Sequence, residues 1–239
     1  MISTLITSIK LIIIIIITLF WSTLAVITGP LNFILPAYHV ISTSWAKWLI
    51  WVSGVKINIV GLENISLDKN YVFVSNHSSL FDIPVLLSSI KNEIKMIAKK
   101  ELAYIPIWGW SLVAGGYILI DRKNPKNAFK AMKKAEKKLK KGTSILVFPE
   151  GTRSDNGSVQ EFKKGAFMLA IQTHLDMIPI SIINSHKVMP KKSFKLSPVT
   201  VHLIIDKPIS MGEIKSLGKD DFINKVRELI IKNCQENRL

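Results

Sequence analysis

The sequence has a single cysteine, Cys234, among its 239 residues. One thiol cannot form an intrachain disulfide, and it cannot supply a metal site built from several cysteines. The lack of disulfides is consistent with a reducing compartment. Acidic residues are also scarce, because 17 Asp and Glu face 32 Lys and Arg, giving a formal net charge of +15. This excess predicts an anionic partner, which could be a phospholipid surface, a phosphorylated substrate or a nucleic acid.

Charged residues of either sign are missing from residue 11 to residue 46. This segment begins with LIIIIIITLFW, in which consecutive isoleucines would cover every face of a helix. A buried helix of a soluble domain is usually apolar on one face only. A removable signal peptide would need a more basic start, and apolar residues continue past the plausible cleavage position after Ala25. Insertion into a membrane is therefore the preferred interpretation.

The uncharged segment is too long for one straight crossing. As a single helix it would extend roughly 54 Å, whereas the hydrocarbon core of a bilayer is ~30 Å thick. Three residues predict a bend: Gly29, Pro30 and Pro36. Beyond it, three tryptophans at intervals of three are typical of a helix at headgroup level: Trp45, Trp48 and Trp51. We expect membrane-associated helices over residues 1–55, and the sequence leaves open whether the first crosses the bilayer or enters one leaflet.

From residue 56 onward, short β-type runs alternate with helical patterns. Strands are predicted at 71–75, 94–98, 117–121, 144–148, 178–183 and 199–205. Helices are predicted at 82–90, 106–114, 125–141, 165–174 and 219–235. This alternation predicts one α/β domain over residues 56–239, with a mixed or largely parallel sheet flanked by helices.

The predicted helix at 125–141 is amphipathic and rich in lysine. Its basic face is interpreted either as solvated surface or as a contact with anionic lipid. The basic residues form no arginine-rich or aromatic-interleaved stripe, so we expect no nucleic-acid partner.

The motif NHSSLFD, residues 76–82, follows a predicted strand and opens a predicted helix. Its His77 and Asp82 would lie at the carboxyl end of the sheet, where α/β folds commonly place their sites. With His77 on the loop and Asp82 in the first helical turn, the carboxylate could fix the imidazole tautomer for proton transfer. The alternative is that Ser78, Ser79 or Asp82 only caps the helix.

Two further strand ends carry polar clusters. FPEGTRS, residues 148–154, brings Glu150, Gly151, Thr152 and Arg153 into one turn, where the glycine permits close backbone approach and the arginine can bind a phosphate. GYILIDR, residues 116–122, ends with a second arginine, Arg122. Clusters at three strand ends favour a functional site over three unrelated surface turns.

These blocks, in this order, resemble the 1-acylglycerol-3-phosphate acyltransferase (lysophosphatidate acyltransferase) family. The family's first block is matched by NHSSLFD, its second by GYILIDR, its third by FPEGTRS and its fourth by IPISII, residues 178–183. The third block is the most specific. Tyr117 and Leu119 depart mildly from the family pattern in the second block. The N-terminal hydrophobic helices are also typical of this family.

The resemblance implies site residues and substrates. His77 is the expected general base, and Asp82 is its orienting partner. Arg122 and Arg153 are expected to bind the phosphate of the acceptor, in a pocket shaped by Glu150, Gly151 and Thr152. Lys100 is a weaker candidate for the phosphate side, and Lys163 is weaker still. No metal or cofactor is implied, and acyl-CoA or acyl carrier protein would serve as co-substrate.

The expected reaction is a direct acyl transfer from a thioester to a lysophospholipid hydroxyl, giving phosphatidic acid, with backbone amides near Gly151 as oxyanion donors. The expected location is the membrane, with the catalytic domain on the cytoplasmic side.

Four other interpretations remain open at this stage. The acceptor could be another lysophospholipid or glycerol-3-phosphate. A nucleophilic Ser78 or Ser79 would make a hydrolase, although no Gly-x-Ser-x-Gly motif is present. A metal-dependent phosphatase would need ligands that His174, His186 and His202 do not offer at ligand spacing. The non-enzyme alternative is a basic peripheral membrane-binding protein.

Overall fold

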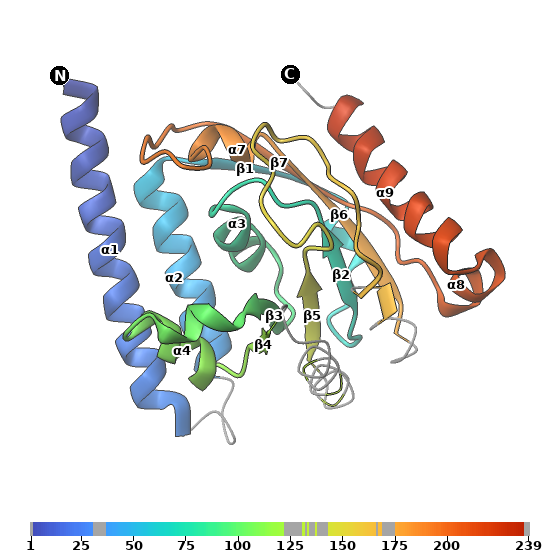
Figure 1. Cartoon of the computed structure of the whole chain (residues 1–239). Helices are drawn as coiled ribbons and strands as arrows, with labels where there is room; N and C mark the ends of the chain where they lie inside the picture. The colour runs from blue at the N-terminus through green and yellow to red at the C-terminus, as the bar shows by residue number, and fades with distance from the viewer. Residues whose placement is uncertain are drawn as a thin grey trace.

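The structure, a computed structural model, describes residues 2–30, 37–121, 143–165, 167–168 and 175–236, together with residues 131, 133 and 137 (Figure 1). The described residues form one sheet of seven strands: β1 Lys56–Val60, β2 Val72–Ser75, β3 Ile94–Lys99, β4 Ile118–Ile120, β5 Ser144–Val147, β6 Met177–Ile183 and β7 Thr200–Ile205. Their spatial order is β1-β7-β6-β2-β5-β3-β4. The β6–β7 pair is antiparallel and the other pairs are parallel, which confirms the predicted mixed, largely parallel sheet.

The central strand β2 is buried on both faces because its alternate side chains enter different layers of the core. Phe73 packs with the helix α3, Asp82–Ser89, whereas Val72 and Val74 pack with α9, Lys219–Glu236, on the other face. In α9 the apolar positions recur at helical spacing and are buried: Phe222, Val226 and Ile230. The sheet therefore lies between helices, and the carboxyl ends of β2 and β5 open at the same edge.

Two long helices stand beside this domain. The first, α1, spans Ile2–Thr28, and the second, α2, spans Ala37–Ser53 (Figure 1). They are joined by hydrogen bonds from Lys10 Nζ to the carbonyl of Ser53, at 3.1 Å, and from Trp45 Nε1 to Thr18 Oγ1, also at 3.1 Å. The first helix ends directly before Gly29 and Pro30, as the sequence predicts.

Most of α1 is exposed in the monomer. At 27 residues it is ~40 Å long, and among the described helices it is the one long and apolar enough to cross a membrane. A helix at a chain's N-terminus with this composition can also be a signal sequence, and length and composition do not separate the two. Only a minority of its side chains are buried, which distinguishes it from the core helix of a soluble domain.

The third helix of this layer, α4, Trp108–Ala114, crosses α1. Ser111 Oγ lies 3.5 Å from Ser22 Oγ of α1, and a side chain at Gly29 would meet Ala114 Cβ at 3.0 Å. The helices α1, α2 and α4 thus form a connected apolar layer next to α3.

The six strands predicted from the sequence are present within two residues of their predicted ends. Strand β1 was not predicted, because its short run alternates between exposed and half-buried residues. Four short helices were also not predicted: η2 Leu62–Asn64, η3 Lys100–Tyr104, α7 Ser185–Val188 and α8 Met211–Leu217. The predicted helix at 125–141 lies outside the described residues except for 131, 133 and 137, which are helical, and the one at 165–174 lies largely outside them.

Candidate active site

The candidate site lies where β2 and β5 end side by side. The strands are parallel neighbours with Val74 opposite Val147, so the loops that follow them emerge together. One loop begins with Asn76 and His77, and the other contains Pro149 to Arg153. A hydrogen bond from the Ser154 N–H to the His77 carbonyl, at 2.8 Å, ties the two loops together. The first and third sequence blocks therefore meet in space.

Asp82 holds the imidazole of His77. His77 Nδ1 lies 2.7 Å from Asp82 Oδ2, and the same oxygen accepts hydrogen bonds from the N–H groups of Ser78 and Ser79, at 2.7 and 2.9 Å. A carboxylate oxygen can only accept from the ring, so Nδ1 carries the proton and Nε2 keeps its lone pair. The five-residue spacing works because His77 is on the loop and Asp82 is the first residue of α3.

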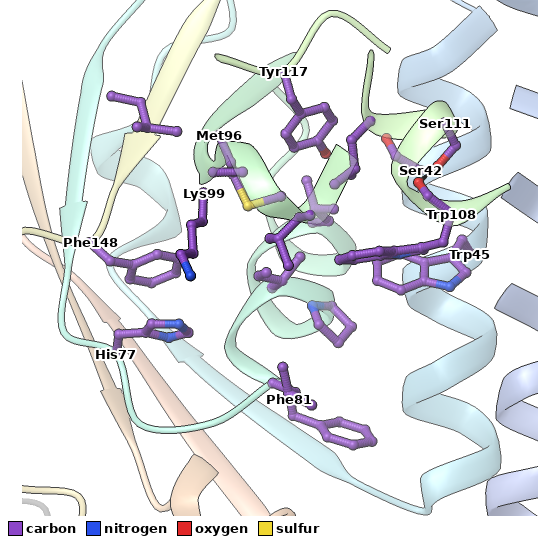
Figure 2. Close-up of a pocket in the computed structure, with 18 of the residues that line it drawn as sticks. Ser42, Trp45, His77, Phe81, Met96, Lys99, Trp108, Ser111, Tyr117 and Phe148 are labelled. Atoms are coloured by element: carbon purple, nitrogen blue, oxygen red, sulfur yellow. Dashed lines mark hydrogen bonds between the residues drawn. The ribbon is translucent and has the colours of Figure 1, made fainter. Parts of the chain in front are cut away.

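The imidazole is further fixed by Phe148. The two rings stack with centroids 4.1 Å apart and an angle of 18° between their planes (Figure 2). The His77 side chain is 17% exposed and lines a cavity, whereas Asp82 is fully buried behind it. This arrangement leaves one edge of the ring available to a molecule in the cavity.

The two serines of the motif stabilise the loop. Ser78 Oγ is 2.8 Å from Ser185 Oγ, and Ser79 Oγ donates to the carbonyl of Met189 at 3.2 Å. Both residues are buried, and neither hydroxyl is hydrogen-bonded to His77 within the described part of the chain. This geometry disfavours a serine nucleophile activated by the histidine.

Asn76 was not predicted as a site residue. Its amide forms two hydrogen bonds with the backbone of Ile182 in β6, one to the carbonyl and one from the N–H, each at 2.8 Å. These bonds fix the residue next to His77 to the sheet. The signal was present in the sequence, because a buried asparagine directly after an apolar strand needs a backbone partner.

Glu150 lies beneath the second loop and does not line the cavity. Its Oε1 accepts a hydrogen bond from the backbone N–H of His77 at 2.7 Å, and its Oε2 accepts one from the N–H of Gln160 at 3.3 Å. The residue is 3% exposed. Burial raises the pKa of this carboxyl to about 7, and the two hydrogen bonds only partly oppose the shift.

The cavity has a volume of about 800 Å³ and runs from His77 into the helical layer. Its polar end is lined by Gly151, Thr152, Arg153 and Lys163. Its other end is lined by apolar residues of α1, α2, α3 and α4, including Trp21, Trp45, Leu87 and Leu112. Figure 2 shows Trp45, Trp108 and Tyr117 on this side of the cavity, across from His77 and Phe148. The cavity can therefore hold a molecule with an anionic head and an apolar tail.

Gly151 exposes the backbone of the turn to the polar end of the cavity. Its φ of +74° suits glycine, and a Cβ there would meet Lys163 Nζ at 3.1 Å. The Gly151 N–H donates to the carbonyl of Phe148 at 3.1 Å and is thus used by the turn itself. The following amides of the same loop belong to Thr152 and Arg153, which both line the cavity.

Two adjacent lysines differ in their surroundings. Each has an acidic neighbour, Glu101 at 3.6 Å for Lys99 and Asp121 at 3.7 Å for Lys100, but Lys100 is not part of the cavity wall. Lys99, which ends β3, lines the cavity, and Figure 2 shows its side chain directed toward Phe148 and His77. Sequence reasoning singled out Lys100, although the rule that selected His77, a polar residue at a strand end, selects Lys99 as well.

Arg122, a predicted phosphate-binding residue, lies outside the described residues. So does His174, one of the histidines that the sequence does not place at metal-ligand spacing. His202 Nδ1 is 3.4 Å from Asn58 Nδ2 on the β1–β7 edge, away from the cavity. Within the described residues, no three His, Cys, Asp or Glu side chains come together as a metal site would require.

Comparison with known proteins gives the same assignment as the motifs. The acyltransferase family model matches residues 56–183. The chain is 42% identical over 174 residues to a chloroplastic 1-acyl-sn-glycerol-3-phosphate acyltransferase of Arabidopsis thaliana, covering 72% of this chain and 48% of that protein. It is 34% identical over 190 residues to the Pseudomonas aeruginosa 1-acyl-sn-glycerol-3-phosphate acyltransferase, covering 77% and 73%. The chain spans about half the length of this Arabidopsis relative and of a chloroplastic relative from Brassica napus.

A solved structure extends the similarity to the N-terminal helices. The crystal structure of the 1-acyl-sn-glycerophosphate acyltransferase PlsC from Thermotoga maritima superposes with a TM-score of 0.82 at 26% identity, covering 99% of this chain and 97% of that one. The resemblance predicted from the four motifs is confirmed, and the chain belongs to the 1-acyl-sn-glycerol-3-phosphate acyltransferase family.

Proposed function

We propose that the protein transfers a fatty acyl group from an acyl thioester to the free hydroxyl of 1-acylglycerol-3-phosphate, giving phosphatidic acid. One observation carries the proposal. The oriented His77–Asp82 pair faces a cavity of about 800 Å³ that has a basic end and an apolar end. A lysophosphatidate has the same two parts, a phosphate and an acyl chain, with its reactive hydroxyl close to the phosphate.

The proposed step uses His77 as a general base. Nε2 accepts the proton of the acceptor hydroxyl while the oxygen attacks the thioester carbonyl. The tetrahedral intermediate then expels the thiolate, which takes the proton back from the imidazolium. Asp82 stabilises the imidazolium and prevents the ring from turning. The products are the phospholipid and a free thiol, with no covalent enzyme intermediate.

Cations at the polar end would bind the acceptor phosphate. Arg153 and Lys163 come from the second loop and Lys99 from the end of β3, and all three line the cavity. Arg153 can form two parallel hydrogen bonds with a phosphate, whereas the lysines act as point charges. Thr152 lines the same pocket, and Gly151 leaves room for the phosphate to approach the backbone. Arg122 stays a prediction, and Lys100 is the weaker of the two adjacent lysines.

Glu150 takes a positioning role in this proposal. It joins the backbone of His77 to that of Gln160, so it holds the first loop against the second. The oxyanion of the intermediate would be stabilised by the Thr152 and Arg153 amides, since the Gly151 amide is used by the turn.

Membrane association is part of the proposal because the acceptor and the product both reside in a bilayer. The exposed face of α1 supplies the apolar surface, and Trp51, 73% exposed on α2 near Lys47, suits the headgroup region. The catalytic domain would face the cytoplasm. The donor would be acyl-CoA or acyl carrier protein, both of which are anionic and suit the basic chain.

The test is a thiol-release assay on purified protein with an acyl thioester and a panel of acceptors. We expect release with lysophosphatidate, less with glycerol-3-phosphate and other lysophospholipids, and none above background for His77→Ala. Ser78→Ala and Ser79→Ala should keep substantial activity as long as circular dichroism shows that they fold. If the serine variants lost activity and His77→Ala kept it, the result would support a covalent serine mechanism instead.

The same assay separates the remaining alternatives. Activity that survives a chelator excludes the metal-dependent phosphatase. If no acceptor gives thiol release although the protein binds vesicles, a basic membrane-binding protein becomes the better description.

A further inference from the structure

The loop between α7 and β7, residues 189–198, has a fixed shape although several of its side chains, those of Lys192, Phe194, Lys195 and Pro198, are exposed. The Ser193 N–H donates to the carbonyl of Pro190 at 3.0 Å, and the Ser197 N–H donates to the carbonyl of Val188 at 2.9 Å. The Lys195 N–H donates to Ser193 Oγ at 3.0 Å. Buried Leu196 anchors the loop. The residues between these bonds are therefore presented to the outside in a defined conformation.

The tip of this loop combines an aromatic side chain with positive charge. Phe194 is 81% exposed, the largest value among the large hydrophobic residues of the described chain. Lys192 and Lys195 beside it are exposed, and neither forms an ion pair with a described residue. No acidic residue occurs anywhere between residues 177 and 205. An exposed phenyl ring between lysines suits an apolar surface with anionic groups at its border.

The loop lies beside the apolar helices. Pro198 Cβ would be 3.3 Å from a Cβ at Gly54, the residue after α2, and Lys10 Nζ of α1 is close to the same point. In Figure 1 the loop that follows α7, drawn in orange, reaches across this end of α2 toward α1. The loop is thus next to the Lys10 end of α1, the helix whose isoleucines are exposed.

The base of the loop belongs to the active site. Met189 lines the cavity, and its carbonyl accepts the hydrogen bond from Ser79. Lys191 Nζ donates to the carbonyl of Arg153 at 2.9 Å and also pairs with Asp155. The base of the loop is therefore hydrogen-bonded to both loops of the candidate site.

We propose that residues 189–198 form a second membrane contact, in which Phe194 enters the headgroup boundary and Lys192 and Lys195 bind anionic phospholipid headgroups. This inference rests on the membrane association included in the proposed function. Together with α1, the loop gives the domain two separate points of attachment, which hold the cavity opening at the lipid surface. An acidic acyl carrier would be attracted by the lysines, but it would not account for the exposed phenyl ring next to an apolar helix.

The test measures where residue 194 lies. A nitroxide is attached to Phe194→Cys in a Cys234→Ala background, in the full chain reconstituted into vesicles of phosphatidylcholine with or without phosphatidylglycerol. The matched control is Leu67→Cys, because Leu67 is 64% exposed but precedes β2, at the opposite end of that strand from His77. Frequent collisions of the nitroxide with oxygen show that it lies in lipid, and frequent collisions with a water-soluble nickel chelate show that it lies in water.

We expect the label at 194 to gain oxygen collisions and lose nickel collisions in vesicles, while the label at 67 stays in water. The change in collisions should be larger with phosphatidylglycerol. The double variant Lys192→Glu with Lys195→Glu should weaken binding of the loop to these vesicles about fivefold per lysine. A label at 194 that stays in water overturns the proposal, as does protection that requires an acyl carrier protein rather than vesicles.

Thiol release measured on the same vesicles separates this proposal from the proposed function. Insertion of the label without thiol release from the donor in the presence of any acceptor supports the loop contact and overturns acyl transfer. Thiol release without insertion overturns the loop contact alone.

Discussion

At the scale of single residues, the site separates side chains that are neighbours in the sequence. Lys99 lines the cavity, whereas Lys100 leaves it and lies next to Asp121. A one-residue difference decides which lysine lines the cavity, because β3 ends at Lys99 and the chain turns into η3 at Lys100. Sequence alone could not choose between two lysines at this position, since the choice depends on where the strand ends to within one residue.

Lys99→Ala should lower kcat/KM for the phosphate-bearing acceptor by about 10- to 100-fold, because a charge-assisted contact contributes ~1.5–3 kcal/mol. Lys100→Ala is the matched control and should change it by no more than a few fold, because that side chain is outside the cavity. The measurement is steady-state thiol release at varied acceptor concentration. Equal losses in the two variants, or an equal loss with an acceptor that has no phosphate, would contradict a role of Lys99 in phosphate binding.

Glu150 makes stability depend on pH near neutrality. Its folded pKa of about 7 exceeds that of an unfolded glutamate, so the folded state binds the proton more tightly. Its contribution is then fully present below the unfolded pKa, near pH 4.5, and is lost as pH rises through 7, by up to roughly 3 kcal/mol. Glu150→Gln should remove this slope, because a neutral amide keeps an acceptor for the His77 N–H.

The measurement is the melting temperature between pH 5 and 8 in one detergent. Asp206 needs a control, because burial raises the pKa of its carboxyl to about 6 and produces a slope of the same sign at lower pH. Asp206→Asn should therefore reduce the dependence of the melting temperature on pH below pH 6 and leave the dependence above pH 6 unchanged. A Glu150→Gln variant with an unchanged slope between pH 6 and 7 would show that Glu150 is ionised throughout this range.

At the scale of elements, the buried runs of the sheet were predictable and the arrangement of the strands was not. β2, β5 and β6 are continuous apolar runs because both faces of each are covered. β1 is an edge strand with alternating exposure, and its partner β7 lies far along the chain, so no local pattern indicates the pair. The meeting of the two loops was predictable, because parallel neighbouring strands end at the same edge of a sheet and so place His77 and Arg153 on one side.

The packing of η3 against α4 depends on Gly109. A Cβ at this position would lie 2.2 Å from the carbonyl oxygen of Leu102 and 2.8 Å from backbone atoms of Ala103. Backbone atoms cannot move aside as a flexible side chain can, so Gly109→Ala should separate the two elements and destabilise the protein by about 1–3 kcal/mol. Because η3 begins directly after Lys99, the same variant should also raise KM for the acceptor.

Gly212→Ala is the control for this substitution. Gly212 lies in α8, and a Cβ there would meet only Ser210 Oγ at 3.7 Å, an ordinary contact. Alanine is preferred over glycine in helices by about 0.8–1 kcal/mol, so this variant should be neutral or more stable. Melting temperatures of the two variants decide the point, and a stable Gly109→Ala protein would show that η3 and α4 are less closely packed.

At the scale of the whole molecule, α1 has two faces with different surroundings. Trp21 and Ala25 line the cavity, whereas Ile12 and Ile16, four residues apart, are 57% and 60% exposed on the other side. The run of six isoleucines predicted an apolar helix, but a uniformly apolar sequence could not indicate which side of the helix would line the cavity. That division comes from packing against α2 and α4.

Substitutions on the two faces of α1 should have different effects. Ile12→Lys with Ile16→Lys places two charges on the exposed face, each costing about 2.5–3.5 kcal/mol if that face is in the bilayer centre. This variant should move from the membrane fraction to the soluble fraction on sedimentation, yet keep its turnover of a short-chain acceptor in detergent. Trp21→Ala should do the opposite, staying with the membrane while turnover falls, because it opens the cavity wall. A double lysine variant that still sediments with membranes would place the attachment elsewhere than on the exposed face of α1, and it would leave the loop at 189–198 as the next surface to test.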